Sequence, residues 1–244
     1  MSPVLAVFRR EFSAYFASPL AAVFIVLFLA LSAALAFYVG GLFERGQADL
    51  QPFFGFHPWL YLLLVPAVAM RLWAEERKSG TLELLLTLPI STTQAVLGKF
   101  LAGWALLSLA LALSFPMWLT IAWLGNPDHG VILASYLGSA LLAGAMLAVG
   151  GALSAATRSQ VVAFVVTVVL CFLMLLAGYP LVQDALQGWA PRPLIDAVAA
   201  LSFLTHFQSI TRGVLDVRDV LFFALSMAAW LLATVVIIDA KKAG

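Results

Sequence analysis

Residues 74–99, AEERKSGTLELLLTLPISTTQAVLGK, interrupt a series of membrane-length apolar segments with six charged side chains. Gly80 and Pro89 enclose a leucine-rich turn made of Leu82, Leu84, Leu85 and Leu86. Exposed apolar side chains grouped in this way mark a contact surface. We therefore expect a short amphipathic helix between two transmembrane spans, placed to receive force from a protein outside the bilayer.

The composition around this insert is that of an integral membrane protein. The chain has 244 residues, of which 64% are hydrophobic and 10% are charged, whereas soluble domains carry about 25% charged residues. A net charge of +1 without a clustered basic face gives no indication of nucleic-acid binding. The single cysteine, Cys171, excludes an internal disulfide and is expected to be a small buried apolar residue.

Six stretches are long and apolar enough to cross a bilayer, which requires about 20 residues per helix. They cover residues 19–40, 53–73, 98–124, 131–156, 161–180 and 219–239. Pro66 falls inside the second stretch and is expected to kink that helix. The sequence thus predicts an all-α, polytopic fold in a single membrane domain, residues 1–244.

The first 17 residues have the pattern of an amphipathic helix lying in the membrane interface. Arg9, Arg10 and Glu11 interrupt apolar residues that recur at helical spacing, namely Val4, Val7, Phe8, Phe12, Tyr15 and Phe16. A cleavable signal peptide would instead place its cations ahead of a short apolar region. A disordered start is the alternative.

The distribution of cations predicts the orientation of the chain. With six spans, both termini lie on one side, together with the insert at 74–97. That side holds nine of the thirteen Lys and Arg residues, which are Arg9, Arg10, Arg71, Arg77, Lys78, Lys99, Arg158, Lys241 and Lys242. The other side holds Arg45, Arg192, Arg212 and Arg218. By the positive-inside rule, the insert and both termini are cytoplasmic.

The segment 179–219 lies on the opposite, outer face. It contains two short apolar stretches, Leu181–Leu186 and Leu194–Phe207, separated by Pro191-Arg192-Pro193. Neither stretch is long enough to cross the membrane, so we expect re-entrant or interfacial helices. A small folded periplasmic cap is the alternative interpretation.

Catalytic patterns are missing from the sequence. Gly98-Lys99 is followed by Phe100, and Thr93 stands where a phosphate-binding loop requires its first glycine. The three histidines, His57, His129 and His206, form no HExxH motif, so we expect no metal site. Serines such as Ser139 and Ser154 lie within spans. We predict that no His or Asp partners them at membrane depth and that they serve helix packing and backbone hydrogen bonding instead.

The span at 131–156 carries small residues at every fourth position, namely Ala140, Gly144, Ala148, Ala152 and Ala156. Such spacing lets two helices approach closely. Packing within the chain is the favoured interpretation, and a dimer interface is the alternative. Ionisable groups are missing from the centres of all six spans, so an ion-driven transport cycle has little to titrate.

The insert resembles the coupling region of the permease subunits of type-2 ATP-binding cassette (ABC) exporters. The residues that carry this resemblance are Glu75, Glu76, Arg77, Gly80, Thr81, Glu83, Leu84, Leu85 and Pro89, followed by Lys99. In that family the run supplies a coupling helix that docks in a groove of the nucleotide-binding subunit. A second run, residues 206–220, is similar to the segment before the last span in the gliding-motility branch. Its matching residues include His206, Arg212, Gly213, Asp216 and Asp219, while Gln208 replaces the usual acidic residue.

The resemblance implies a type V exporter fold and a non-catalytic permease subunit of an ATP-driven transporter. Its implied partners are two copies of a cytoplasmic ABC ATPase, which bind ATP and Mg²⁺, and a second permease copy or homologue. This chain would hold no cofactor, and its place would be the bacterial inner membrane. The substrate would cross at the permease–permease interface, lined by the first, second and fifth spans.

Two other functions remain open. One is an ABC-like complex that transmits force to a periplasmic accessory subunit without transporting a substrate; the segment 179–219 favours it. The other is an intramembrane enzyme acting on lipid, which the lack of polar groups at depth disfavours. Within the favoured reading, Glu75 and Glu76 are expected to pair with Arg9 and Arg10 or with the ATPase. A solvated loop that only enforces topology is the alternative role for these charges.

Overall fold

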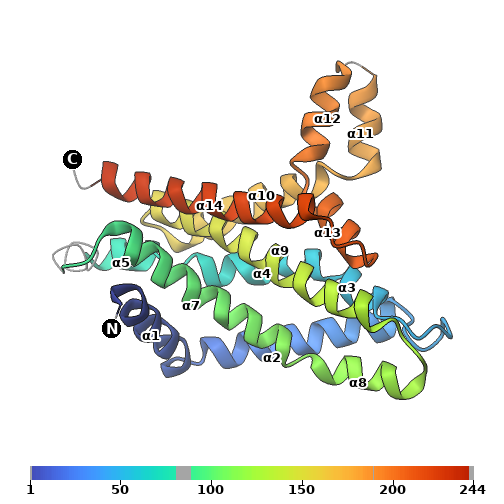
Figure 1. Ribbon diagram of the computed structural model, residues 1–244. Coiled ribbons are helices and arrows are strands. Elements are labelled where there is room, and N and C mark those ends of the chain that lie inside the picture. The colour runs from blue at the N-terminus through green and yellow to red at the C-terminus, as the bar shows by residue number, and fades with distance from the viewer. Residues whose placement is uncertain (1, 81–88, 189, 242–244) are drawn as a thin grey trace.

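The computed structural model describes residues 2–80, 89–188 and 190–241, and every element in these ranges is helical (Figure 1). The all-α prediction is confirmed there. The elements are α1 (Pro3–Ala17), α2 (Leu20–Ala34), the π-helical turn η1 (Leu35–Val39), α3 (Gln51–Gly55), α4 (His57–Ala69), α5 (Ala74–Ser79), α7 (Thr92–Ala112), α8 (Phe115–Leu124), α9 (His129–Ala156), α10 (Gln160–Leu176), α11 (Pro180–Gln187), α12 (Arg192–Ala200), α13 (Phe203–Thr211) and α14 (Val217–Ala240).

Helix α9 forms the centre of the bundle and packs against α4, α7, α10, α13 and α14. Its small residues allow these close approaches. A Cβ atom on Gly150 would lie 2.4 Å from the Cβ of Ala69, and one on Gly144 would lie 2.8 Å from the Sδ of Met227. The small residues of this helix therefore serve packing within the chain, as the favoured interpretation had it.

Four helical segments are long and apolar enough to cross a membrane: Ala21–Val39, Thr92–Leu124, His129–Ala156 and Val217–Ala240. Each overlaps a predicted span. The other two predicted spans correspond to shorter helices, since α4 has 13 residues and α10 has 17. Both fall below the length of about 20 residues that a perpendicular crossing needs. The count of six spans thus remains a prediction.

Prolines divide two of the predicted spans. Helix α4 begins anew after α3 with Pro58 in its first turn, a position where the missing amide hydrogen costs nothing. Pro116 has the same place in α8, which divides the predicted span 98–124 after α7. Pro66, in contrast, lies inside α4, and the helix continues to Ala69.

The two ends of the bundle differ in what they carry. Helix α1, helix α5 and the C-terminal end of α14 lie at one end, and α3, α13 and the α8–α9 connection lie at the other (Figure 1). The cation-rich segments predicted to be cytoplasmic therefore gather at one end. Helix α1 packs closely on α7, because a Cβ atom on Gly98 would come within 2.6 Å of the Cβ of Val7.

The segment 179–219, which the sequence predicts to lie on the outer face, forms three helices instead of two. Ser202 divides the stretch 194–207, because its side chain accepts a hydrogen bond from the Thr205 amide and caps α13. Helices α11 and α12 pack on each other and project sideways from the bundle as a hairpin (Figure 1). Cys171, in α10, is fully buried, as predicted.

Candidate functional site

The start of α7 fixes the position of the central cation of the site. Ser91 and Gln94 form a capping box, in which the Ser91 side chain accepts from the Gln94 amide and the Gln94 side chain accepts from the Ser91 amide. Helix α7 therefore begins at Thr92, and Lys99 lies two turns inside it. The neighbouring Gly98 lets α1 approach this turn.

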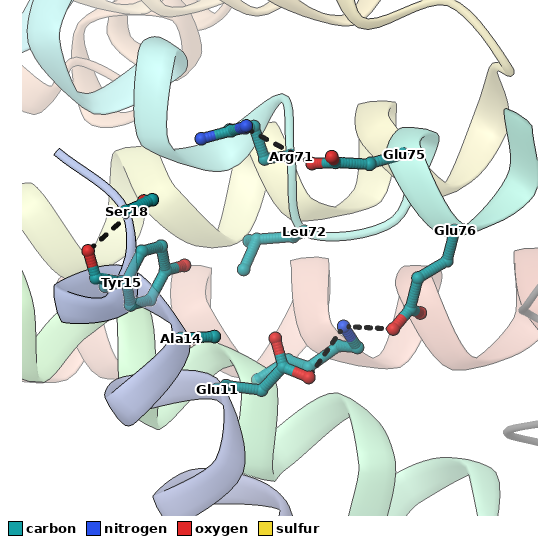
Figure 2. A pocket seen from close by; sticks show the side chains of 9 residues that line it. Glu11, Ala14, Tyr15, Ser18, Arg71, Leu72, Glu75 and Glu76 are labelled. Carbon is teal, nitrogen blue, oxygen red and sulfur yellow. Dashed lines mark hydrogen bonds and ion pairs between the residues drawn. The ribbon is translucent and has the colours of Figure 1, made fainter. Parts of the chain in front are cut away.

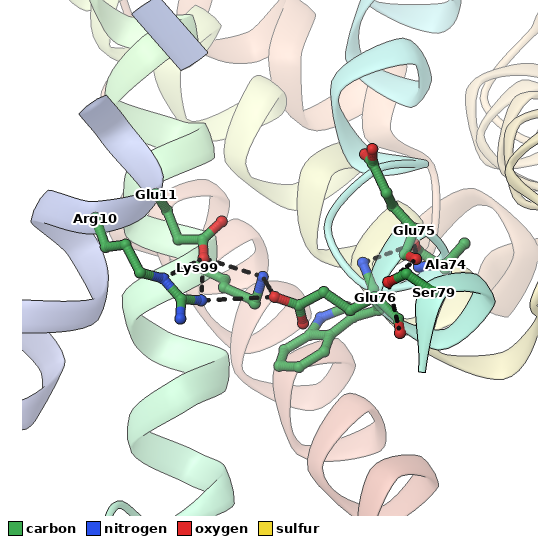
Figure 3. A network of polar contacts seen from close by, with 9 residues as sticks. Arg10, Glu11, Ala74, Glu75, Glu76, Ser79 and Lys99 are labelled. Carbon is green, nitrogen blue, oxygen red and sulfur yellow. Dashed lines mark hydrogen bonds and ion pairs between the residues drawn. The ribbon is translucent and has the colours of Figure 1, made fainter. Parts of the chain in front are cut away.

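Lys99 joins three helices through buried ion pairs. Its Nζ lies 3.2 Å from Oε1 of Glu11 in α1 and 2.9 Å from Oε1 of Glu76 in α5 (Figure 3). The Lys99 side chain is 2% exposed, and its Nζ also lies 5.1 Å from the centre of the Trp73 ring. Arg10 adds contacts of 2.5 Å to Glu11 and 3.5 Å to Glu76. We call Arg10, Glu11, Glu76 and Lys99 the three-helix ion network.

The charges of the three-helix ion network balance. Burial raises the pKa of the Glu11 carboxyl, but attraction to Lys99 and Arg10 and their hydrogen bonds outweigh it, so that pKa is held below its ordinary value of 4.5. Glu11 is thus ionised at neutral pH. Removing one member of such a network leaves an uncompensated charge in a poorly solvated place, which is strongly destabilising.

A cavity of about 340 Å³ opens beside the network (Figure 2). Its lining comes from α1 and the residue after it, the turn that follows α4, α5 and α7. It consists of Glu11, Ala14, Tyr15, Ser18, Arg71, Leu72, Glu75, Glu76 and Lys99. Glu11 and Glu76 are each about one-fifth exposed, 18% and 19%. The network is therefore reached from the cavity without being fully hydrated.

Ser154 of α9 fastens the junction between α4 and α5. Its Oγ accepts hydrogen bonds from the amides of Trp73 at 3.1 Å and Ala74 at 3.0 Å, and it donates to the Met70 carbonyl at 3.0 Å. Arg77 adds a bond from its guanidinium to the Ala155 carbonyl at 2.7 Å. Helix α5 is thus held on the C-terminal end of α9. The predicted role of Ser154 in backbone hydrogen bonding is confirmed.

The remaining predicted residues of the insert differ in their contacts. Glu76 pairs with Arg10, as predicted, whereas Glu75 pairs with Arg71 one helical turn away at 3.2 Å, so its expected pairing with Arg9 or Arg10 is not the one seen. Gly80 ends α5 with a φ of +73°, a conformation that favours glycine. Pro89 precedes the cap of α7. Thr81, Glu83, Leu84 and Leu85 lie outside the described residues.

At the end of the bundle opposite α1 and α5, His206 and Asp219 meet. The Nδ1 of His206 lies 2.6 Å from Oδ1 of Asp219, and its Nε2 lies 3.1 Å from the Ala200 carbonyl. Both side chains are buried, and the imidazole stacks on Phe222 with ring centres 3.9 Å apart. Each ring nitrogen therefore has an oxygen partner within hydrogen-bond distance, and we call the first of these contacts the His206–Asp219 pair. It ties the end of α12 and α13 to α14.

The other predicted outer residues do not join this pair. Asp216 caps α14 by accepting from the Arg218 amide, and Gly213 has a φ of +89° after the end of α13. Arg212 lines a separate cavity of about 210 Å³, together with Asp49 and Asp128.

The structure also shows a buried histidine contact that contradicts the sequence interpretation. Ser139 Oγ lies 2.6 Å from Nδ1 of His57 and 2.8 Å from the Tyr61 hydroxyl, so the expectation that no histidine partners these serines is wrong. The spacing of His57 and Tyr61, which places both on one face of α4, was the available signal. Both His57 and Ser139 are completely buried, so a substrate cannot contact Ser139 in this conformation. The contact joins α4 to α9.

Within the described residues, no group of three His, Cys, Asp or Glu side chains is arranged to hold a metal ion. The polar contacts described above join helices of the bundle to one another.

Comparison with protein families identifies this architecture. The family described as ABC-2 family transporter protein matches residues 5–239, which is nearly the whole chain. No curated protein matches the chain. The match runs from α1 to the end of α14 and so includes both the three-helix ion network and the His206–Asp219 pair. The chain therefore belongs to the ABC-2 family of transporter proteins and is a membrane-embedded permease component.

Proposed function

We propose that this chain is the permease subunit of an ATP-driven ABC-2 transporter in the bacterial inner membrane, with both termini cytoplasmic. Two copies of a cytoplasmic ATPase would act on the 74–97 insert, and a second permease copy or a homologue would complete the pathway. ATP and Mg²⁺ would be bound by the ATPase. In this arrangement α4 and α10 are the two shorter crossings and bring the total to six.

The observation that carries the proposal is the burial of Lys99 between Glu11 and Glu76. Residues 81–88 lie between α5 and the start of α7, and the three-helix ion network joins these two helices to α1. Ion pairs with little solvent around them resist separation, because each partner would be left as an unpaired charge. A push on the insert would therefore move α1, α5 and α7 together.

A second route leads from the insert to the centre of the bundle. Ser154 and Ala155 of α9 hold the α4–α5 junction and Arg77. Since α9 packs against five other helices, displacement of α5 would reach most of the membrane domain through it. Packed interfaces of this kind move as semi-rigid bodies and do not deform continuously.

Docking of the ATPase is tested by two substitutions in the insert, Glu83→Arg and Leu85→Asp. Each is expected to abolish copurification of a coexpressed cytoplasmic ATPase without preventing membrane insertion. Leu215→Asp provides a matched control, because Leu215 is 51% exposed and lies beyond α13 at the other end of the bundle. Normal copurification of the ATPase with both insert variants would contradict the docking role.

Force transmission is tested separately from docking by Lys99→Gln. The variant is expected to retain the ATPase but to lose the ATP-dependent change in distance between spin labels on α1 and α8. Arg71→Gln serves as the control, since the Arg71–Glu75 pair is partly exposed and lies within a single helical turn. An unchanged distance response in Lys99→Gln would remove the mechanical role of the network.

Force transmission to a periplasmic partner is the second candidate function. The observation that favours it is the α11–α12 hairpin, which projects from the side of the bundle (Figure 1). Leu181 of this hairpin is 76% exposed. A photocrosslinker at position 181 should then capture an accessory protein in intact cells. Efficient ATP-driven substrate transport by the purified permease and ATPase alone would exclude this alternative.

A further inference from the structure

Four cations gather where α5, the α9–α10 turn and the end of α14 meet. They are Arg77 and Lys78 of α5, Arg158 of the turn and Lys241 after α14. Within residues 2–80, 89–188 and 190–241, none of the four forms an ion pair with a carboxylate. We call these residues the basic cluster.

Two of these cations donate hydrogen bonds to carbonyl groups at the C-terminal end of α9. Arg77 donates to the Ala155 carbonyl at 2.7 Å, and Lys241 donates to the Ala156 carbonyl at 2.6 Å. A helix C-terminus carries about half a negative charge, so it cannot neutralise two cations, and Lys78 and Arg158 add two more. Burial followed by repulsion from Arg158 lowers the pKa of Arg77. Burial followed by repulsion from Arg77 and Arg158 lowers the pKa of Lys241.

The acidic residues of α5 do not compensate the basic cluster. Glu75 pairs with Arg71, and Glu76 pairs with Arg10 and Lys99 in the three-helix ion network. Helix α5 thus directs Glu76 toward α1 and α7 (Figure 3). Glu75 reaches Arg71, and Arg77 reaches the end of α9. The basic cluster keeps a net positive charge.

A cavity of about 410 Å³ lies beside two members of the basic cluster, Lys78 and Arg158. Its lining consists of Lys78, Thr157, Arg158, Ser159, Gln160 and Val161. The two cations and two hydroxyl groups offer hydrogen-bond donors to an anion. The cavity has room for a phosphate with its substituents.

An exposed apolar stripe begins at the edge of this cavity. Val161, Val165 and Val169 follow one another at intervals of four residues along α10 and are 70%, 49% and 51% exposed. Leu173 continues the row at 56% exposure. Residues at this spacing lie on one face of a helix, so a cationic cavity leads directly onto an apolar surface about three turns long.

We propose that the basic cluster binds the headgroup phosphate of an anionic phospholipid, with an acyl chain lying along the Val161–Leu173 stripe. The combination of a cationic cavity and a continuous apolar stripe fits an amphiphile. An acidic protein surface would engage the cations but leave the stripe uncovered. This inference goes beyond the proposed transport function and does not depend on the ATPase.

The site is tested with the full-length chain in detergent, titrated with photoactivatable phosphatidylglycerol. Crosslinks are expected in residues 157–173. The double variant Lys78→Gln/Arg158→Gln should raise the half-saturating lipid concentration about 30-fold, since each cation near an anionic lipid contributes roughly fivefold. The matched control, Arg45→Gln/Arg212→Gln, removes two cations at the opposite end and should leave labelling unchanged. Arg158→Lys keeps the charge and should keep the labelling.

Several results would overturn the site. Equal labelling by photoactivatable phosphatidylcholine would show that charge is not recognised. Competition by inorganic phosphate as effective as that by phosphatidylglycerol would assign the cavity to a free anion. Unchanged labelling in the double variant would also contradict the proposal, and if that variant lost a coexpressed ATPase, the cations would belong to a protein interface. Lost labelling in Arg158→Lys would show that charge alone does not account for the binding.

Discussion

The Nζ of Lys99 lies 2.9 Å from Oε1 of Glu76, although these residues stand at opposite ends of the 74–99 insert. The ion pair therefore closes the insert into a loop. Its two ends are α5 and the second turn of α7. They cannot separate without leaving Lys99, whose side chain is only 2% exposed, without its Glu76 partner. A protein that grips the middle of the insert would move both ends as one body.

Replacing Lys99 with Met should destabilise the chain strongly. The substitution leaves Glu11 and Glu76 facing each other with only the half-exposed Arg10 between them, and breaking a buried pair in this way costs about 3–5 kcal/mol. The temperature midpoint of unfolding in detergent should fall. Size-exclusion chromatography with fluorescence detection measures this midpoint. The triple variant Lys99→Met/Glu11→Gln/Glu76→Gln should recover part of the loss. Arg71→Gln, which breaks a partly exposed pair, should change stability by at most about 1 kcal/mol. Equal effects of Lys99→Met and Arg71→Gln would contradict the central position of Lys99.

Glu11 should make the fold acid-sensitive. Its pKa in the folded chain is below the ordinary value of 4.5, with burial opposing and Lys99 and Arg10 producing the decrease. A lowered pKa gives stability that is fully present above the unfolded value and is lost as the pH falls through the folded value. The unfolding midpoint should therefore decrease below about pH 4.5, and Glu11→Gln should flatten this dependence. An identical acid profile in the variant would show that Glu11 is not the titrating group.

Ser154→Ala should loosen the junction between α4 and α5. The substitution leaves the buried amides of Trp73 and Ala74 without their acceptor, at a cost of about 1–3 kcal/mol. Amide hydrogen exchange at residues 73 and 74 should accelerate. Ser135→Ala is the matched control in the same helix, because Ser135 donates to the Val131 carbonyl one turn away and so joins no second helix through this bond. Comparable exchange in both variants would mean that Ser154 does not hold the junction.

Asp219→Ala should release α13 from α14. Without the carboxylate, His206 loses the 2.6 Å contact that connects the two helices, and hydrogen bonds to charged groups contribute about 1.5–3 kcal/mol. Hydrogen exchange should increase across Phe203–Thr211. Asp216→Ala removes the cap of α14 instead, so its effect should be confined to the start of that helix. If α13 kept its protection from hydrogen exchange in Asp219→Ala, the His206–Asp219 pair would not be what holds α13 on α14.

Hydropathy and cation counts predicted much of this fold because membrane helices satisfy their backbone internally and must be long and apolar. The four long apolar helical segments, a helix within the first 17 residues and the pairing of Glu76 with Arg10 agree with the sequence predictions. The two short helices, α4 and α10, were overestimated because apolar flanks extend hydropathy beyond the helix ends. Pro58 and Pro116 in fact begin new helices.

The contacts that the sequence did not reveal are tertiary. In the sequence Lys99 contributes a cation to the predicted orientation, and only the packing of α1 and α5 around α7 shows that it is buried. The contact between His57 and Ser139 joins residues 82 positions apart, so the spacing of His57 and Tyr61 places both on one helix face but does not identify Ser139 as their partner. The split at Ser202 was visible as a capping residue, but the surrounding apolar run concealed it.

The burial of Cys171 gives the native chain an experimental advantage. Its only thiol belongs to α10 and is 0% exposed, so the surrounding bundle shields it from maleimide and methanethiosulfonate reagents. New cysteines introduced on exposed faces can therefore be labelled selectively without first building a cysteine-free background. Pulsed electron resonance and single-molecule fluorescence then become available in an otherwise unmodified polypeptide.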